Sequence, residues 1–165
     1  MGVEIVFKSN IPGVMNKINS TIRERMEDAV SEVRNTTVEI LSGSGSGRQY
    51  HVPGTKATYN ASSPGKPPAS ATGHLRQNIA TEVSSDGKEG AVGTDDDYGR
   101  MLEFGTKGGA VILPKKGKVL AWFADGEMHF AKRIIQGPIA PRPWLRVSFE
   151  KSAQAVKEIF TKLWF

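Results

Sequence analysis

Apolar residues recur at three- and four-residue steps along the first quarter of the chain, and this spacing predicts one long amphipathic helix over residues 13–41. Asn10 and Pro12 mark its start, because a proline in the first turn gives up an N–H that would have no helical partner there. The stripe consists of Met15, Ile18, Ile22, Met26, Ala29, Val33 and Ile40. We expect it to pack against a sheet, and a subunit contact along part of so long a helix is the alternative.

Alternation of apolar and polar residues predicts strands in three parts of the chain. The first is the amino-terminal run of Val3, Ile5 and Phe7. The other two are hairpins, each made of two runs of strand-forming residues on either side of an Asp-Gly turn. They cover residues 79–84 with 90–94 around Asp86 and Gly87, and residues 118–123 with 128–135 around Asp125 and Gly126.

Shorter helices are predicted between and after these strands. Thr72 can cap a short helix in which Leu75 and Ile79 share one face. The acids at residues 95–97 open a second helix, since carboxylates are favoured at the positive end of a helix. A third helix follows a proline-rich segment near the carboxy terminus, and its stripe consists of Leu145, Phe149, Ser152, Val156, Ile159 and Leu163.

The order of these elements predicts an α+β fold, with a mainly antiparallel sheet against which the long amino-terminal helix and the carboxy-terminal helix pack. A chain of 165 residues with 38% hydrophobic residues fits one folded domain, residues 1–165. Residues 42–71 differ, because they are rich in Gly, Ser and Pro and have few large apolar side chains. We expect this segment to be a long flexible loop that neighbouring proteins order on assembly.

Basic residues are concentrated in two acid-free segments, although the net charge of the whole chain is only +5. One segment covers residues 40–81 and the other covers residues 105–124, with Lys107, Lys115, Lys116 and Lys118. Concentrated positive charge favours a polyanionic neighbour such as DNA or an acidic protein. Solvated loops are the alternative interpretation.

Patterns that would carry catalysis or metal binding are missing from the sequence. Cysteine is absent, which excludes disulfides and thiolate chemistry, and the three histidines lack the spacing of a zinc site. The glycine-rich SGSGSGR lacks the ending of a phosphate-binding loop, the acid triplet lacks the alternation of an EF-hand, and there is no GxSxG turn. We therefore expect no enzymatic activity, no catalytic residue, and no bound metal or cofactor.

The sequence also bears on location. It has neither the apolar core of a signal peptide at its amino terminus nor a stretch of about 20 apolar residues that could span a membrane. We expect synthesis in the cytoplasm and no contact with a membrane.

Three segments, read together and in this order, resemble the phage neck family of tail-completion and head-tail joining proteins in long-tailed, lambdoid-type bacteriophages. They are SPGKPPASATGHLRQNI at residues 63–79, YGRMLEFGT at residues 98–106 and APRPWLRV at residues 140–147. The resemblance implies a small, ring-forming virion protein that acts without catalysis between the portal complex and the tail tube. Its expected partners are further copies of itself and neighbouring neck and tail proteins, and its basic loops are candidates for non-specific contact with packaged DNA.

Residues in the last two of these segments have expected structural or contact roles. Gly105 is expected to end the second helix through a positive φ, and Glu103 is left for a polar contact. Arg142 and Arg146 lie four residues apart and are predicted to share a helix face at an interface, with solvated arginines as the alternative. The expected structural anchors are Tyr98, Leu102, Phe104, Gly105, Pro143, Trp144 and Leu145.

A basic nucleic-acid-binding module is the alternative function. It rests on the net positive charge and the two basic segments. Such a module normally has a recognisable motif or aromatic residues between its lysines, and residues 115–118 have neither.

Overall fold

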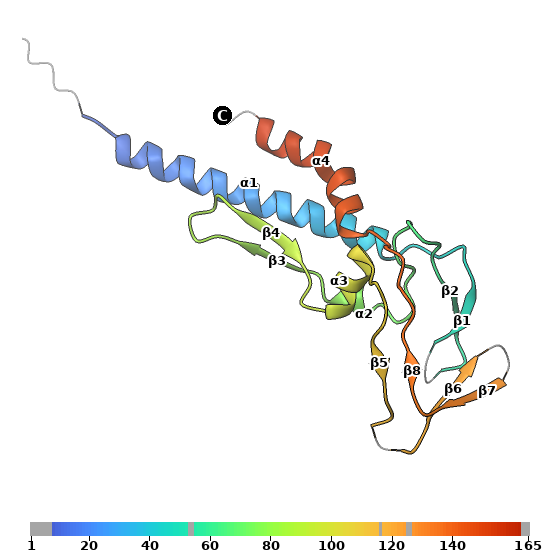
Figure 1. Cartoon of the computed structure of the whole chain (residues 1–165). Coiled ribbons are helices and arrows are strands. Elements are labelled where there is room, and N and C mark those ends of the chain that lie inside the picture. The colour runs from blue at the N-terminus through green and yellow to red at the C-terminus, as the bar shows by residue number, and fades with distance from the viewer. Residues whose placement is uncertain (1–7, 53–54, 116, 125–126, 163–165) are drawn as a thin grey trace, which may run out of the picture.

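The computed structural model describes residues 8–52, 55–115, 117–124 and 127–162 (Figure 1). The helices are α1 (Ile11–Ile40), α2 (His74–Gln77), α3 (Asp97–Phe104) and α4 (Leu145–Thr161). The strands are β1 (Gln49–His51), β2 (Thr58–Asn60), β3 (Ala80–Val83), β4 (Gly90–Gly93), β5 (Val111–Ile112), β6 (Leu120–Ala124), β7 (Glu127–Ala131) and β8 (Ile134–Ile135). The predicted strand at Val3, Ile5 and Phe7 lies outside the described residues, as do Lys116 and the turn at Asp125 and Gly126.

The fold class is α+β, as predicted, and the strands pair in an antiparallel manner. They form four two-stranded ladders: β1–β2, β3–β4, β5–β8 and β6–β7. The predicted hairpin over residues 79–94 is confirmed in β3–β4, and Gly87 takes a φ of 73° in its turn. A left-handed φ of this kind favours glycine because a Cβ would clash with the backbone.

Helix α1 confirms the first prediction, but only its second half is covered by the rest of the chain. Ala29, Val30 and Val33 are buried, whereas Ile11 at its start is 68% exposed and Val14 is also exposed. The apolar stripe therefore serves as core along the carboxy-terminal half of α1 and remains open to solvent along the amino-terminal half.

The two long helices pack against each other, and the β3–β4 hairpin covers another side of α1 (Figure 1). The hairpin comes close to the helix at Gly90, where a Cβ would lie 2.5 Å from Val30 Cγ1. A glycine is needed there because any side chain would push β4 away from α1. Helix α4 thus packs mainly against α1.

A small core joins the carboxy-terminal end of α1 to α2, α3 and the start of α4. Its buried members are Leu41, Leu75, Ile79, Leu102 and Trp144. The predicted helix ends at Gln77, so Ile79 lies outside it and does not share a helix face with Leu75, but both side chains are buried in this one cluster. The Thr72 hydroxyl accepts a hydrogen bond from the His74 N–H at 3.3 Å, next to the single turn of α2.

Residues 42–71 are not structureless throughout, which corrects the expectation of a plain loop. Strands β1 and β2 form a hairpin in which Tyr50 pairs with Tyr59, and their ring centroids lie 6.0 Å apart. Val52, directly after β1, is buried. A cross-strand aromatic pair stabilises a hairpin even when the surrounding composition is polar, and composition alone did not reveal it.

A long excursion of the chain leaves the core after α3 and returns before α4. We call residues 106–139 the projection, because β5 and β8 run away from the helices with β6 and β7 at their far end (Figure 1). Thr106 pairs with Ile139 at its base. The predicted hairpin over residues 118–135 is confirmed in β6–β7, but residues 134–135 separate from it and pair with β5.

Candidate functional site

The three segments that carry the sequence resemblance meet at one place. The Gly65 N–H donates to the Pro141 carbonyl at 2.9 Å, and the Arg142 N–H donates to the Leu102 carbonyl at 2.7 Å. These two hydrogen bonds link residues 63–79, 98–106 and 140–147. We call this meeting point the junction; it lies between the helices and the base of the projection.

Glu103 connects α3 to the start of α4. Its Oε2 accepts hydrogen bonds from the N–H groups of Trp144 at 2.7 Å and Leu145 at 2.9 Å, and its Oε1 accepts one from Arg146 at 3.1 Å. The first N–H groups of a helix have no partner within the helix, and a carboxylate also complements their partial positive charge. The sequence left Glu103 for an unspecified polar contact. Trp144, just before α4, has no side chain that can cap the helix. That absence is the sequence signal that a distant carboxylate caps it instead.

Trp144 is the largest buried side chain of the junction and is 2% exposed. Its indole Nε1–H donates to the Gly99 carbonyl at 3.0 Å. Gly99 has to be small, because a Cβ there would lie 2.7 Å from Thr94 Cγ2 and 2.9 Å from Leu75 Cδ1. The structure places Leu102 and Pro143 in the same buried region, with Leu145 partly buried against the cluster.

Gly105 ends α3 and has no room for a side chain. Its φ is 71°, and a Cβ there would meet the Ile139 carbonyl oxygen at 2.5 Å. This close approach positions the chain to leave α3 and begin the projection beside its returning strand.

The prediction that Tyr98 and Phe104 are structural anchors is wrong, because both side chains are exposed. The Phe104 side chain is 74% exposed and Tyr98 is also exposed. Helix α3 has only about two turns, and it turns Gly99 and Leu102 toward the core. Residues spaced as 98, 101 and 104 therefore fall on the outer side of the helix.

The predicted pairing of Arg142 with Arg146 on one helix face is also wrong. Helix α4 begins at Leu145, so Arg142 lies in the extended chain before it and cannot follow helical spacing. Arg146 is on the exposed surface of α4, where its Nε lies 3.8 Å from Glu150 Oε1. Arg142 instead lines a cavity in the junction.

The lysines of the second basic segment are exposed but do not lie together. Lys107 is in the connection between α3 and β5, at the base of the projection. Lys115 and Lys118 are in the connection between β5 and β6, beyond a stretch of extended chain. Among the described lysines, this second pair remains a candidate for one local positive surface, and Lys116 lies outside the described residues.

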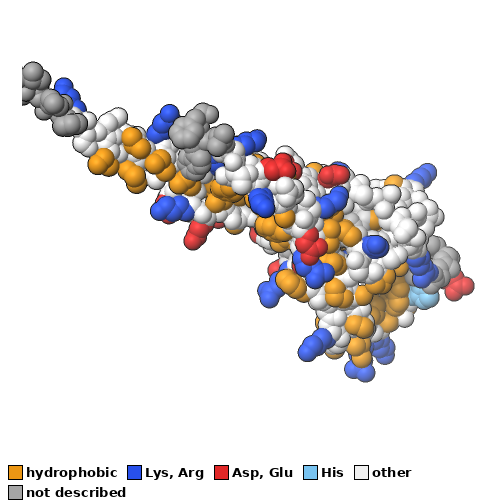
Figure 2. Space-filling model, turned by 90° about the horizontal axis from the view of Figure 1, so that it is seen from above, with side chains coloured by type: hydrophobic (Ala, Val, Ile, Leu, Met, Phe, Trp, Pro, Cys, Tyr) orange, Lys and Arg blue, Asp and Glu red, His pale blue; other side chains and the backbone are white. Residues whose placement is uncertain are grey.

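Large hydrophobic side chains are exposed at both ends of the molecule (Figure 2). On α1 they belong to the amino-terminal half of the helix. On the projection they are Val111, Ile112, Leu113, Val119, Trp122, Met128, Phe130 and Ile135. Apolar surface gathered in this way commonly marks contact with another protein.

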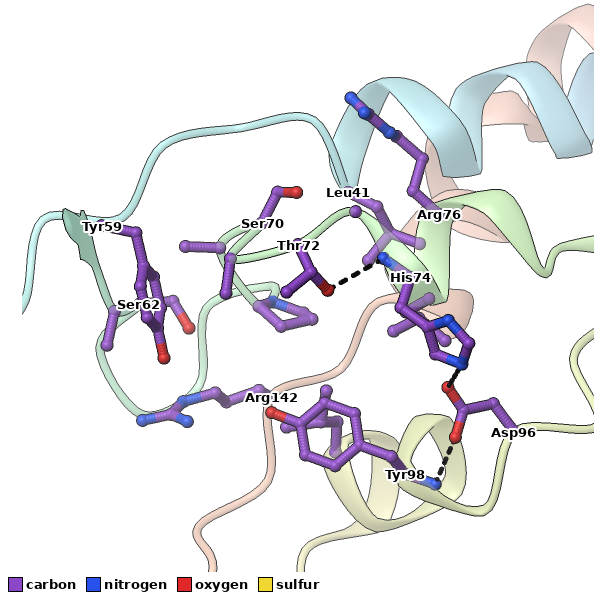
Figure 3. Close-up of a pocket in the computed structure, with 17 residues that line it drawn as sticks. Leu41, Tyr59, Ser62, Ser70, Thr72, His74, Arg76, Asp96, Tyr98 and Arg142 are labelled. Carbon is purple, nitrogen blue, oxygen red and sulfur yellow. Dashed lines mark hydrogen bonds and ion pairs between the residues drawn. The ribbon is translucent and has the colours of Figure 1, made fainter. Parts of the chain in front are cut away.

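The junction contains a cavity of about 360 Å³ (Figure 3). Its walls come from residues 68–76 together with Tyr59, Ser62, Tyr98 and Arg142, which other parts of the chain contribute. Sequence reasoning did not find this cavity, because its walls come from segments far apart in the chain.

Asp96 and Tyr98 form one side of the cavity. Asp96 Oδ1 accepts from the Tyr98 N–H at 3.0 Å and caps α3, and Asp96 Oδ2 lies 3.6 Å from His74 Nε2. The pKa of the Tyr98 hydroxyl is raised above its usual value of 10.0. Partial burial of the hydroxyl is the largest cause, and the nearby Tyr59 is the next largest. The hydroxyl therefore keeps its proton at neutral pH and can donate a hydrogen bond.

The described part of the chain contains no group of three or more His, Cys, Asp or Glu side chains placed to hold a metal ion. None of its helices combines the length and the apolar character needed to cross a membrane.

No family model matches the chain, and comparison with curated proteins and with solved structures finds no match either.

Proposed function

We propose that this chain is a structural subunit of the phage neck, made in the host cytoplasm and carried in the virion, that forms or joins a ring which completes the tail and connects it to the head. The observation that carries the proposal is the set of large hydrophobic side chains that the described part of the chain leaves exposed on the amino-terminal half of α1 and on the projection.

The position of the exposed apolar residues supports an assembly role. The amino-terminal half of α1 and the projection each leave large hydrophobic side chains in solvent, and they lie at different ends of the molecule. Two different patches on one subunit suit a head-to-tail contact, in which one patch of each copy meets the other patch of the next. Contacts of this kind close into a ring when the rotation between copies allows it.

The junction supports the specific choice of the phage neck. The segments that resemble the neck family are the ones that hold the projection to the helices, through Glu103, Trp144 and the hydrogen bond between Arg142 and Leu102. A shared junction would set the direction of the projection and thus the geometry of a subunit contact. The resemblance and the assembly surface therefore involve connected parts of the molecule.

The first test is whether the chain is a stoichiometric component of the particle. We expect mass spectrometry of purified virions to find it at a fixed copy number. A phage that lacks its gene should accumulate heads and tails that do not join. Absence of the chain from purified virions would contradict the proposal.

The second test addresses the subunit contacts by native mass spectrometry of the purified chain, alone and with its neck and tail partners. We expect a closed oligomer of one size in at least one of these mixtures. Phe130→Ser on the projection should reduce it, because Phe130 is exposed in the single chain and buried in the proposed contact. Lys151→Glu on the exposed surface of α4 is the control and should leave assembly unchanged. A monomer under all conditions would contradict the ring.

A further inference from the structure

Three buried polar side-chain atoms in the walls of the junction cavity have no hydrogen-bond partner among the described residues. They are Ser62 Oγ, Asp96 Oδ2 and Arg142 Nε. Ser62 is more than nine-tenths buried. Buried donors and acceptors are nearly always paired, because leaving one unpaired gives up its hydration without a replacement. Three such atoms around one cavity indicate a ligand with matching polar groups.

The chemistry of the walls defines that ligand. Figure 3 shows Arg142 and Asp96 on opposite sides of Tyr98, so the cavity has a cationic side and an anionic side. The cationic side offers donors from Arg142 and Ser62, with the Tyr98 hydroxyl between the two sides. The anionic side offers Asp96 Oδ2, which lies 3.6 Å from His74 Nε2 but has no hydrogen-bond donor among the described residues, so it can accept from an N–H of a ligand. A matching ligand therefore presents a carboxylate toward Arg142 and a hydrogen-bond donor toward Asp96, on the other side of Tyr98.

We propose that this cavity binds a short acidic segment of a partner protein, with an Asp or Glu carboxylate on Arg142 and Ser62 and a backbone N–H on Asp96. An arginine can hold a carboxylate through charge-assisted hydrogen bonds. The cavity volume of about 360 Å³ falls at the lower end of the roughly 300–1,000 Å³ found for small-ligand sites, and so it accepts one or two residues of a peptide. This site goes beyond the neck assignment and does not depend on it.

A phosphate of DNA fits the same cavity less well. It has no N–H to offer, and its negative charge would approach the carboxylate of Asp96. A DNA duplex is also too wide for the cavity, since the major groove alone is about 12 Å across. The peptide satisfies both sides, whereas the phosphate satisfies only the cationic one.

The test measures binding of N-acetyl-Ala-Glu-Ala-amide to the full chain by saturation-transfer NMR on the peptide, which works at any oligomer size. N-acetyl-Ala-Gln-Ala-amide is the matched control, because it has the same shape without the charge. We expect saturable binding of the Glu peptide and at least about tenfold weaker binding of the Gln peptide. Equal binding of the two peptides, or binding of neither, would overturn the proposal.

Variants of the chain locate the binding. Arg142→Gln should weaken binding of the Glu peptide at least about tenfold. The fold should persist, because the backbone N–H of residue 142 still donates to Leu102. Arg146→Gln is the control, since Arg146 lies on the exposed surface of α4. A circular dichroism melt checks that both variants fold. An Arg142→Gln chain that folds and binds as well as Arg146→Gln would overturn the assignment.

A second variant separates a peptide site from a simple anion site. Asp96→Asn keeps an oxygen to cap the Tyr98 N–H but removes the negative charge. It should strengthen binding of inorganic phosphate severalfold and weaken binding of the Glu peptide. Tighter binding of phosphate than of the Glu peptide to the unmodified chain would show an anion site and refute the peptide. The neck assignment is tested on virions, so either proposal can fail alone.

Discussion

The Glu103 carboxylate accepts a hydrogen bond from the backbone N–H of Trp144 at 2.7 Å, across 41 positions of sequence. The same carboxylate accepts from the next two N–H groups of α4. One side chain of a two-turn helix thus fixes where the last long helix of the molecule begins. The entire projection lies between these two residues, so this contact also closes the chain around its base.

Glu103→Ala should lower the free energy of unfolding by about 2 kcal/mol, because it removes three hydrogen bonds to a charged acceptor and the favourable charge at the start of α4. Glu103→Gln keeps an acceptor and should lose about half as much. The measurement is urea unfolding followed by circular dichroism. Glu150→Ala removes only an exposed pair with Arg146 and should cost less than about 0.5 kcal/mol. Equal losses for Glu103→Ala and Glu150→Ala would show that the cap contributes little.

Trp144→Ala should destabilise the fold by about 3 to 5 kcal/mol, since it empties the largest buried position of the junction. Trp144→Phe retains most of the apolar contact and loses the bond from Nε1 to the Gly99 carbonyl, so a smaller loss of about 1 to 2 kcal/mol is expected. Thermal melts of both variants check this order. The control is Phe130→Ala, whose side chain is exposed in the single chain and should leave the monomer melt unchanged. A folded Trp144→Ala chain with an unaltered melting temperature would contradict the burial.

Changing Lys115 and Lys118 to Glu should leave the fold intact, because exposed charges usually alter stability by less than about 0.5 kcal/mol. If these lysines face DNA or an acidic neighbour in the neck, the variant phage should make heads and tails that fail to join, or joined particles that leak DNA. Particle counts by electron microscopy and infectivity measure both effects. Lys151→Glu on α4 serves as the control. Normal yields of infectious particles with the reversed lysines would identify them as solvated residues.

The pKa of Asp86 lies below 3.8, mainly because the Ser84 hydroxyl donates to its carboxylate at 2.6 Å, and also because the Lys88 N–H donates to it at 3.2 Å. A carboxyl whose pKa is lower in the folded chain stabilises the fold above its unfolded pKa. That contribution is lost as the pH falls through the lowered pKa. Carboxyl carbon shifts in an NMR titration should show that the pKa of Asp86 lies below 3.8. Ser84→Ala should move the pKa of Asp86 back toward 3.8, and an unchanged value would contradict the assigned cause.

The helices and the turns were predictable because their signals are local. The stripe of α1 repeats within the helix, Asp96 and Gly105 sit at the two ends of α3, and Gly87 falls in the turn that it permits. Each of these features is decided by residues fewer than about ten positions apart, which is the range that periodicity and capping patterns cover.

The junction was not predictable from the same patterns, because it depends on distant partners. Glu103 and Trp144 are brought together only after the projection has left and returned. Arg142 was assigned to a helix that in fact begins three residues later, so its spacing to Arg146 had no helical meaning. Phe104 was expected to be a structural anchor, but burial of Leu102 toward the core leaves Phe104 on the exposed side of α3. Tertiary contacts decided each of these outcomes.

The β1–β2 hairpin was missed for a different reason. The composition of residues 42–71 is that of a flexible linker, and the pair of Tyr50 and Tyr59 is too small a part of it to change that average. Whether the rest of this segment is flexible in the free chain stays a prediction. Amide exchange can test it, because the N–H groups of Val52 and Ala61 have backbone partners and should exchange more slowly than their neighbours.

The closed base of the projection makes it a replaceable module. Thr106 and Ile139 exchange hydrogen bonds of 2.9 and 3.1 Å, so the chain returns to the place where it left. Lengthening a loop whose ends are already held together costs little, since each doubling of its length adds only about 0.6 kcal/mol. An insertion or exchange between these two residues should therefore leave the helices unchanged. For an engineer, the same pair marks where a foreign hairpin can be grafted.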